Sequence, residues 1–172
     1  IPELRERIGI VPQKAVLLKG SIRENMRRGK DDATDDEILA AAKTAQAADV
    51  IESKGGLDFE IEQGGKNLSG GQRQRFTIAR ALVRKPEILI LDDSASALDF
   101  ATDAALRRSI CEMDTNPTVF IVSQRTSSIQ HADKIIVLDD GKIAGIGKHD
   151  ELLNNCPVYS EIYNSQFKKE AV

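Results

Sequence analysis

The sequence predicts an α/β fold with a largely parallel sheet, because helix patterns and strand patterns alternate along it. Ile88–Leu91 is a continuous apolar run, as expected of a strand that is buried on both faces. A helical pattern precedes this run and closes at Pro86, and Thr102–Met113 follows it as a further predicted helix. Another apolar run, Thr118–Val122, predicts the next strand.

The first elements are predicted by the residues that begin and end them. Arg7–Val11 has the pattern of a short buried strand, and Pro12 ends it. A helix is expected after Ser21, because Ser21 is a good N-cap, Glu24 completes a capping box and Gly29 suits the C-terminal stop.

The segment 34–51 repeats this pattern and is predicted to be helical. Thr34 is the expected cap, Glu37 lies three residues later, and an apolar face begins at Ile38. Residues 58–62 are expected to form a short strand. Because residues 21–57 are mostly helical, the sequence predicts a helical insertion before the sheet resumes.

The last third of the chain predicts a hairpin and a helical tail. Ile135–Leu138 is an apolar strand, and Asp140-Gly141 is a hairpin turn that leads into a second strand at Lys142–Ile146. The tail, Asp150–Lys168, has a helical pattern with a break at Pro157.

The composition is that of a globular domain with a substantial core. The chain has 172 residues, which suffices for one such domain. A net charge of −3 argues against nucleic-acid binding through a basic surface. No apolar run is long enough to span a bilayer, and the first residues lack the pattern of a signal peptide. Cys111 and Cys156 form no C-x-x-C motif and are expected to be reduced thiols.

The segment Leu68–Gln72, with the sequence LSGGQ, begins a predicted helix that starts near Ser69. Ser69 can cap this helix, while Gly70 and Gly71 leave backbone N–H groups uncovered at its N-terminus, where the helix dipole favours an anion. A glycine-rich turn that merely starts a helix is the alternative interpretation of these residues alone.

Two adjacent carboxylates, Asp92 and Asp93, end the apolar strand. The carboxyl ends of strands in α/β sheets face the crevice where ligands bind. There Asp92 could hold Mg²⁺ against substrate phosphates, and the residue after it is placed to polarise an attacking water. The alternative is a structural cap after the strand.

Together these segments resemble the nucleotide-binding domain of an ATP-binding cassette (ABC) transporter of the exporter subfamily. Four motifs carry the resemblance, in family order: the Q-loop at Val11-Pro12-Gln13, the signature at Leu68–Gln72, the Walker B strand at Ile88–Asp92 and the D-loop at Ser96–Asp99. The resemblance covers nearly the whole chain. Chromosome-maintenance and repair ATPases share such a signature, but they insert a long coiled coil that is missing between Gln13 and Leu68.

The resemblance implies a partial P-loop NTPase (RecA-like) core with a helical signature subdomain. Residues 1–20 would be a core segment with the Q-loop, 21–85 the helical subdomain, and 86–172 the core with Walker B, D-loop, switch region and C-terminal helices. ATP and Mg²⁺ are the implied cofactors. The implied nucleotide-binding residues are Ser69, Gly70, Gly71, Gln72, Gln13 and Asp99, and the implied metal ligands are Asp92 and Gln13.

The resemblance also implies partners. Two such domains stack head to tail with ATP between them, so Ser69, Gly70 and Gly71 would contact the γ-phosphate held by the partner. Each domain would be attached to a transmembrane domain at the cytoplasmic face of the cell membrane, and no nucleic acid is expected to bind.

Three departures from the family pattern qualify this prediction. No G-x-x-x-x-G-K-S/T loop is present, so the chain is expected to be a fragment without Walker A, which alone would bind ATP poorly and be inactive. Asp93 occupies the position of the family's catalytic Glu, and Gln124 occupies the position of the family's switch histidine. Asp93 is one methylene shorter, and Gln124 cannot transfer a proton near neutral pH.

Both catalytic changes, at Asp93 and Gln124, affect the groups that position the attacking water, while the signature is intact. This asymmetry is similar to that of heterodimeric exporters, in which one composite site hydrolyses ATP and the other turns it over slowly. The chain is therefore expected to be the subunit whose own site is hydrolysis-impaired. The alternatives are a homodimer that hydrolyses ATP slowly with Asp93, and a non-catalytic nucleotide-binding regulatory module.

Overall fold

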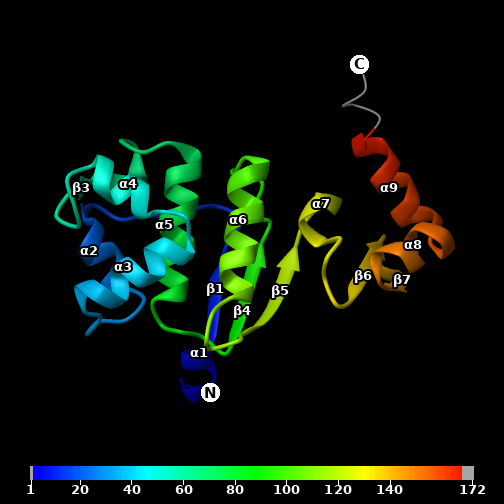
Figure 1. The fold of residues 1–172 in the computed structure, drawn as a ribbon, viewed down its shortest axis with the longest axis horizontal. Helices are drawn as coiled ribbons and strands as arrows, with labels where there is room; N and C mark the ends of the chain where they lie inside the picture. Colours follow the sequence, from blue (N-terminus) through cyan, green and yellow to red (C-terminus); the bar gives the residue numbers. More distant parts are fainter. Residues whose placement is uncertain (1, 168–172) are drawn as a thin grey trace. The chain divides into compact units, whose positions relative to one another are not determined.

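The structure is a computed structural model that describes residues 2–167 and shows two compact units, which meet at the bond between Val122 and Ser123 (Figure 1). Lys168, the predicted end of the helical tail, lies outside the described residues. Among the described helices, none is long and apolar enough to cross a membrane.

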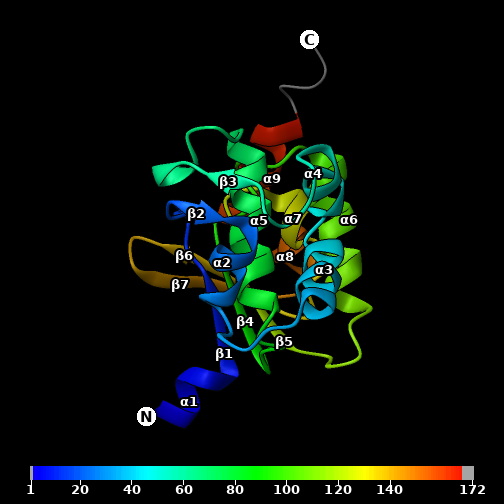
Figure 2. The ribbon, with the colours of Figure 1, turned by 90° about the vertical axis from the view of Figure 1, so that its left-hand side faces the viewer.

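A three-stranded parallel sheet organises the first unit. Its strand order is β1 (Ile8–Val11), β4 (Ile88–Asp92) and β5 (Thr118–Val122). The helices α5 (Gly70–Leu82) and α6 (Phe100–Cys111) run alongside this sheet in both Figure 1 and Figure 2. The predicted α/β class and the parallel sheet are therefore confirmed.

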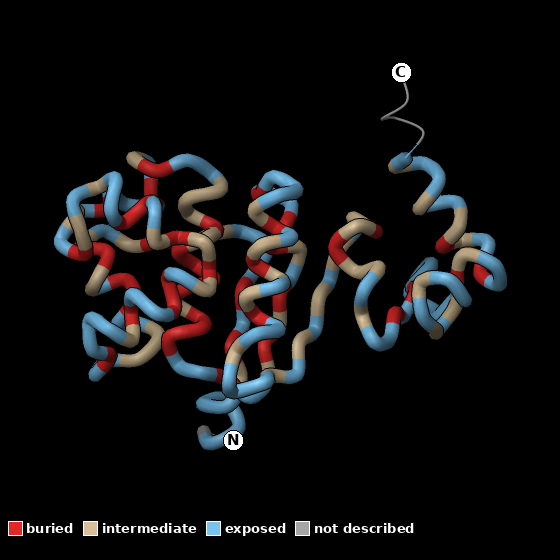
Figure 3. Tube along the Cα trace, viewed as in Figure 1, coloured by how far each residue is buried: buried red, intermediate tan, exposed pale blue. Residues whose placement is uncertain are grey.

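Burial on the sheet is one-sided, which corrects the expectation that 88–91 is buried on both faces. Leu89 and Leu91 are buried, whereas Ile88 and Ile90 are only partly covered. Side chains alternate between the two faces of a strand, and the face that carries Ile90 also carries exposed apolar residues. These exposed residues are Ile10 at 60%, Phe120 at 56% and Val122 at 55% relative exposure. Figure 3 shows only exposed and intermediate colours along β5.

A group of helices forms the middle of the first unit. Both predicted capping boxes are present: Ser21 with Glu24 begins α2 (Ile22–Arg27), and Thr34 with Glu37 begins α3 (Asp35–Thr44). The remaining elements of the first unit are α1 (Pro2–Arg7), β2 (Gly20–Ser21), α4 (Ala48–Ser53), β3 (Glu60–Ile61) and the 3₁₀ turn η1 (Gln63–Gly65). β2 and β3 pair as a short antiparallel ribbon.

The prediction that 34–51 is helical holds except at one turn. Helix α3 ends at Thr44, Gln46 adopts a left-handed φ of 57°, and α4 begins at Ala48. Nothing in the sequence marks this break, because Gly or Asn is the usual residue at such a position.

The core of the first unit gathers around α5. This helix contacts α2, α3 and β1, and Phe76 near its centre is fully buried. The apolar spacing that predicted the helix therefore corresponds to the face that joins the helical group to the sheet.

The second unit is a hairpin with helices. β6 (Ile135–Asp139) and β7 (Lys142–Gly147) are antiparallel, and both turn residues, Asp140 and Gly141, have positive φ, as the predicted hairpin turn requires. The helices are α7 (Thr126–Ile129), α8 (His149–Asn155) and α9 (Pro157–Phe167), so the predicted break at Pro157 is present. A small core around Leu152 and Tyr159 holds this unit together.

Candidate functional site

The carboxyl edge of the parallel sheet brings together residues that are far apart in the sequence. Val11 pairs in register with Leu91, so the loop after β1 lies beside the loop after β4. Gln13 donates a hydrogen bond from Nε2 to Oδ2 of Asp93 at 3.1 Å. The structure thus places the amide of the predicted Q-loop against the carboxylate at the predicted base position.

The backbone of Asp93 is fixed in an uncommon conformation. Its φ is 45°, in the left-handed region, where Asp and Asn are the most frequent residues after Gly. The Asp93 N–H donates to the carbonyl of Val122 at 2.8 Å, and the Ser96 hydroxyl donates to the carbonyl of Asp93 at 2.8 Å. The backbone of Asp93 is therefore fixed by hydrogen bonds at its N–H and at its carbonyl, and its carboxylate accepts a hydrogen bond from Gln13.

Asp92 ends β4 directly before this turn, and its side chain is exposed at the same edge. Asp92, Asp93 and Gln13 offer carboxylate and amide oxygens, which are the donors that Mg²⁺ prefers. Because Gln13 uses its nitrogen toward Asp93, its oxygen is the atom left to face an ion. No group of three acidic, His or Cys residues that could hold a metal lies within the described residues. Mg²⁺ commonly binds through one or two carboxylates and takes its other ligands from water and phosphate.

The LSGGQ segment forms a capped helix start. The Ser69 hydroxyl accepts from the N–H of Gln72 at 3.2 Å, and Gln72 Oε1 accepts from the N–H of Ser69 at 3.0 Å. This is a capping box, which the S-x-x-Q spacing could have predicted and which the sequence analysis overlooked for Gln72. The N–H groups of Gly70 and Gly71 belong to the first turn of α5, where helical N–H groups have no acceptor within the helix.

Arg73 stabilises this turn through hydrogen bonds to backbone carbonyls, which the sequence did not predict. Its guanidinium donates to the carbonyl of Leu68 at 2.7 Å and to that of Gly65 at 3.3 Å. The Arg73 side chain thus binds two carbonyls of the segment that precedes α5.

Gly71 packs closely against the predicted D-loop. A Cβ at Gly71 would lie 3.3 Å from the carbonyl oxygen of Ala97 and 3.9 Å from Leu98 Cδ2. A Cβ at Gly70 would meet only the end of Arg73, at 3.9 Å. The structure therefore joins the signature and the D-loop segment into one surface.

Asp99 is the N-cap of α6, a role that the sequence analysis did not assign. Its two carboxylate oxygens accept from the N–H of Thr102 at 2.9 Å and from the Thr102 hydroxyl at 2.7 Å. These two hydrogen bonds, the backbone one first, lower the pKa of Asp99 below its ordinary value.

We expect Asp99→Ala to lower the Tm by a few degrees at neutral pH, because the variant loses this cap. Since the folded pKa lies below the unfolded one, the contribution of Asp99 is fully present above the unfolded pKa of about 4 and disappears as the pH falls through the folded value. Thermal melts at pH 7 and below pH 3 should show the difference between wild type and variant shrinking in acid. A difference that persists in acid would contradict this assignment; Asp114→Ala, at an exposed turn, is the control.

Gln124 lies in the second unit, two residues after β5. Its side chain is exposed, and its backbone carbonyl accepts from Gln166 Nε2 of α9 at 2.6 Å. Gln124 is thus anchored through its backbone to α9 within the second unit.

Comparisons with known proteins agree on one family. The sequence model described as "ABC transporter" matches residues 1–96. The chain is 46% identical over 97% of its length to the uncharacterized ABC transporter ATP-binding protein YfiB of Bacillus subtilis, of which it covers 29%. It is 45% identical over 95% of its length to the Beta-(1→2)glucan export ATP-binding/permease protein NdvA of Rhodopseudomonas palustris, of which it covers 27%.

A solved structure described as a bacterial Atm1-family ABC exporter with ATP bound matches 98% of this chain with a TM-score of 0.89 at 38% identity. This chain covers 29% of that one. The chain thus spans less than a third of the length of these relatives, and the similarity extends over both of its units.

Proposed function

This chain belongs to the ABC transporter family, and from that premise we propose that it is the ATP-binding and ATP-hydrolysing domain of an exporter. In this function, nucleotide-driven pairing of two such domains moves a transmembrane domain at the cytoplasmic face of the cell membrane. ATP and Mg²⁺ are the cofactors. One observation carries the proposal: the capped LSGGQ turn and the D-loop form one surface through the contact of Gly71 with Ala97.

That surface is suited to an anion held by a partner. The helix start presents the N–H groups of Gly70 and Gly71 next to the positive end of the α5 dipole. We propose that it covers the γ-phosphate of an ATP whose other contacts come from a second nucleotide-binding domain. The division into a core segment at 1–20, a helical subdomain at 21–85 and a second core segment at 86–172 remains part of this proposal.

At the chain's own site, Asp92 would hold Mg²⁺ together with Gln13, and the ion would supply charge neutralisation for the phosphates. Asp93 would act on the attacking water, with Gln13 holding its carboxylate at 3.1 Å. We propose that this site is hydrolysis-impaired, because Asp93 reaches less far than Glu and Gln124 offers no titrating group. The pairing is then a heterodimer, in which Ser69, Gly70 and Gly71 complete the competent site of the partner.

The test is Gly71→Asp in the full-length protein assembled with its partner subunit. The variant adds a negative charge to the first turn of α5, near the place proposed for the γ-phosphate, and its Cβ would also press on the carbonyl oxygen of Ala97 at 3.3 Å. Two like charges about 4 Å apart repel by about 4 kcal/mol at an effective dielectric constant of about 20. We expect at least a tenfold loss of hydrolysis at the site that this signature covers, about 1.4 kcal/mol or more. Single-turnover hydrolysis and nucleotide trapping at each site measure the loss.

Asn116→Asp is the matched control, because it adds the same charge at an exposed turn after α6. It should leave both sites unchanged. A uniform loss at both sites in Gly71→Asp would indicate the homodimer instead, and ATP binding without hydrolysis at either wild-type site would indicate the regulatory module.

A further inference from the structure

Gln46 occupies a backbone position that normally belongs to glycine. Helix α3 ends in a Schellman motif: the N–H of Ala47 donates to the carbonyl of Ala42 at 2.7 Å, and the N–H of Gln46 donates to that of Lys43 at 3.1 Å. The residue between the helix end and Ala47 must be left-handed, and Gln46 has a φ of 57°. For a residue with a Cβ this conformation is unfavourable, whereas glycine adopts it freely.

A hydrogen bond to the carbonyl of Gln46 helps to stabilise this turn. Arg75 of α5, six residues after Ser69, donates from Nη1 to this carbonyl at 2.5 Å. The same nitrogen contacts the carboxylate of Asp49 in the first turn of α4 at 3.0 Å. The guanidinium therefore ties the LSGGQ helix to the turn between α3 and α4.

The side chain of Gln46 reaches in the opposite direction. Its Nε2 donates to the hydroxyl of Ser109 on α6 at 2.9 Å and makes longer contacts of 3.4 Å with the carbonyls of Lys43 and Thr44. Helix α6 begins at Phe100, directly after its N-cap Asp99, which is the last residue of the D-loop. One residue thus contacts both the helix that carries LSGGQ and the helix that follows the D-loop, and glycine would lose the second contact.

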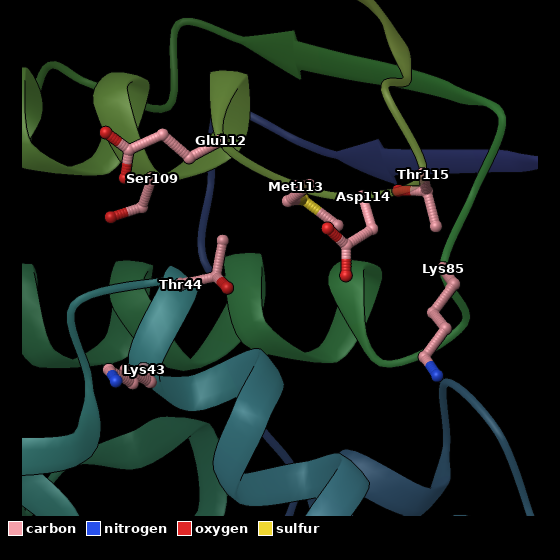
Figure 4. Close-up of a pocket in the computed structure, with 8 residues that line it drawn as sticks. All are labelled: Lys43, Thr44, Lys85, Ser109, Glu112, Met113, Asp114 and Thr115. Atoms are coloured by element: carbon pink, nitrogen blue, oxygen red, sulfur yellow. The ribbon is translucent and has the colours of Figure 1, made fainter.

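This contact is open on one side, although the neighbouring residues Ala45 and Ala47 are buried. A cavity of about 380 Å³ lies beside it, between the ends of α3 and α6 and the loop after α5 (Figure 4). Its lining includes Thr44, Lys85, Ser109 and Glu112. Buried residues of α3 and α6 belong to one hydrophobic cluster, so the hydrogen bond to Ser109 adds to the packing between these helices.

We propose that Gln46 is a positioning residue that fixes helices α3, α4 and α5 relative to α6, and so keeps the LSGGQ turn and the D-loop in one arrangement. The hydrogen bond of its side chain to Ser109 offsets part of the cost of its left-handed backbone. The catalytic consequence rests on the proposed function, but the structural consequence does not.

The structural test measures the distance between α4 and α6 in the full-length protein, with spin labels at the exposed positions Glu52 and Arg108. Wild type should give one narrow distribution. Gln46→Gly and Ser109→Ala should both broaden it, because each removes the hydrogen bond. Unchanged distributions in both variants would overturn the proposal.

Lys85→Gly is the matched control. Lys85 is also left-handed, with a φ of 52°, and it lines the same cavity. Both glycine variants relieve backbone strain, so Lys85→Gly should raise the Tm by about 2–4 °C, and Gln46→Gly should not lower it. Of the two glycine variants, only Gln46→Gly should broaden the distance distribution. A broadened distribution in Lys85→Gly as well would assign the effect to backbone relief and overturn the role of Gln46.

The functional measurement is the ATPase rate of the assembled protein. Gln46→Gly should lower it roughly fivefold, the equivalent of one hydrogen bond of about 1 kcal/mol, without loss of thermal stability. A wild-type protein that hydrolyses no ATP would contradict the proposed function, and the distance distributions would still decide the inference. If the wild type is active and Gln46→Gly has the same ATPase rate and an equally narrow distance distribution, the inference is overturned while the proposed function stands.

Discussion

Asp93→Glu combined with Gln124→His is expected to raise single-turnover ATP hydrolysis at this chain's own site by roughly 10²-fold. The geometry gives the reason. Gln13 binds the carboxylate of Asp93 and Ser96 binds its carbonyl, so both contacts favour the observed place of a side chain that is one methylene shorter than Glu. One added methylene extends its reach, and an imidazole at position 124 adds a group that can transfer a proton near neutral pH.

The measurement follows the nucleotide in each site of the full-length protein with its partner. Asp93→Gln with Gln124→His is the control, because it has the longer side chain but no carboxylate, and it should show no gain. The left-handed backbone at position 93 is less suited to Glu than to Asp, so the Tm of each variant is recorded beside its rate. Equal and fast hydrolysis at both wild-type sites would show that Asp93 is a working base, and the heterodimer proposal would fail.

Phe76→Ala is expected to lower the free energy of unfolding by about 3–5 kcal/mol. Phe76 has no exposed surface and lies on α5, which contacts α2, α3 and β1. Removing its ring loses the transfer free energy of the buried atoms and leaves a cavity between helices and sheet. Because the stability of a domain is commonly about 5–15 kcal/mol, this single change takes a large part of it.

Urea denaturation, monitored by circular dichroism on the full-length protein, measures this loss. Phe120→Ala is the control, since Phe120 is 56% exposed, and it is expected to cost less than about 1.5 kcal/mol. Equal losses in both variants would show that the region around α5 is not the centre of the core. The two variants differ only in where the same ring is removed.

Much of the local structure follows from neighbouring residues. The capping boxes at Ser21 and Thr34 form as predicted, because cap and partner are three residues apart and need no distant contact. The hairpin turn at Asp140-Gly141 is confirmed for the same reason. The motif order along the chain, read with these elements, was sufficient to indicate the α/β fold and the ABC transporter family.

Contacts between distant segments could not be predicted from the sequence. The meeting of Gln13 with Asp93, separated by most of the helical group, depends on the parallel register of β1 and β4. The close approach of Gly71 to Ala97 depends on how α5 packs beside the D-loop.

Two local features also depend on contacts with residues that are distant in the sequence. The side of β4 that is buried depends on which helices cover the sheet, and an apolar run looks the same whether one face or both are covered. The break at Gln46 opposes the local preference, because glycine would favour the turn while Arg75 and Ser109 hold a glutamine there. Local propensities determine caps, turns and periodicity, whereas packing free energy, summed over residues far apart in the chain, determines register, burial and strained positions.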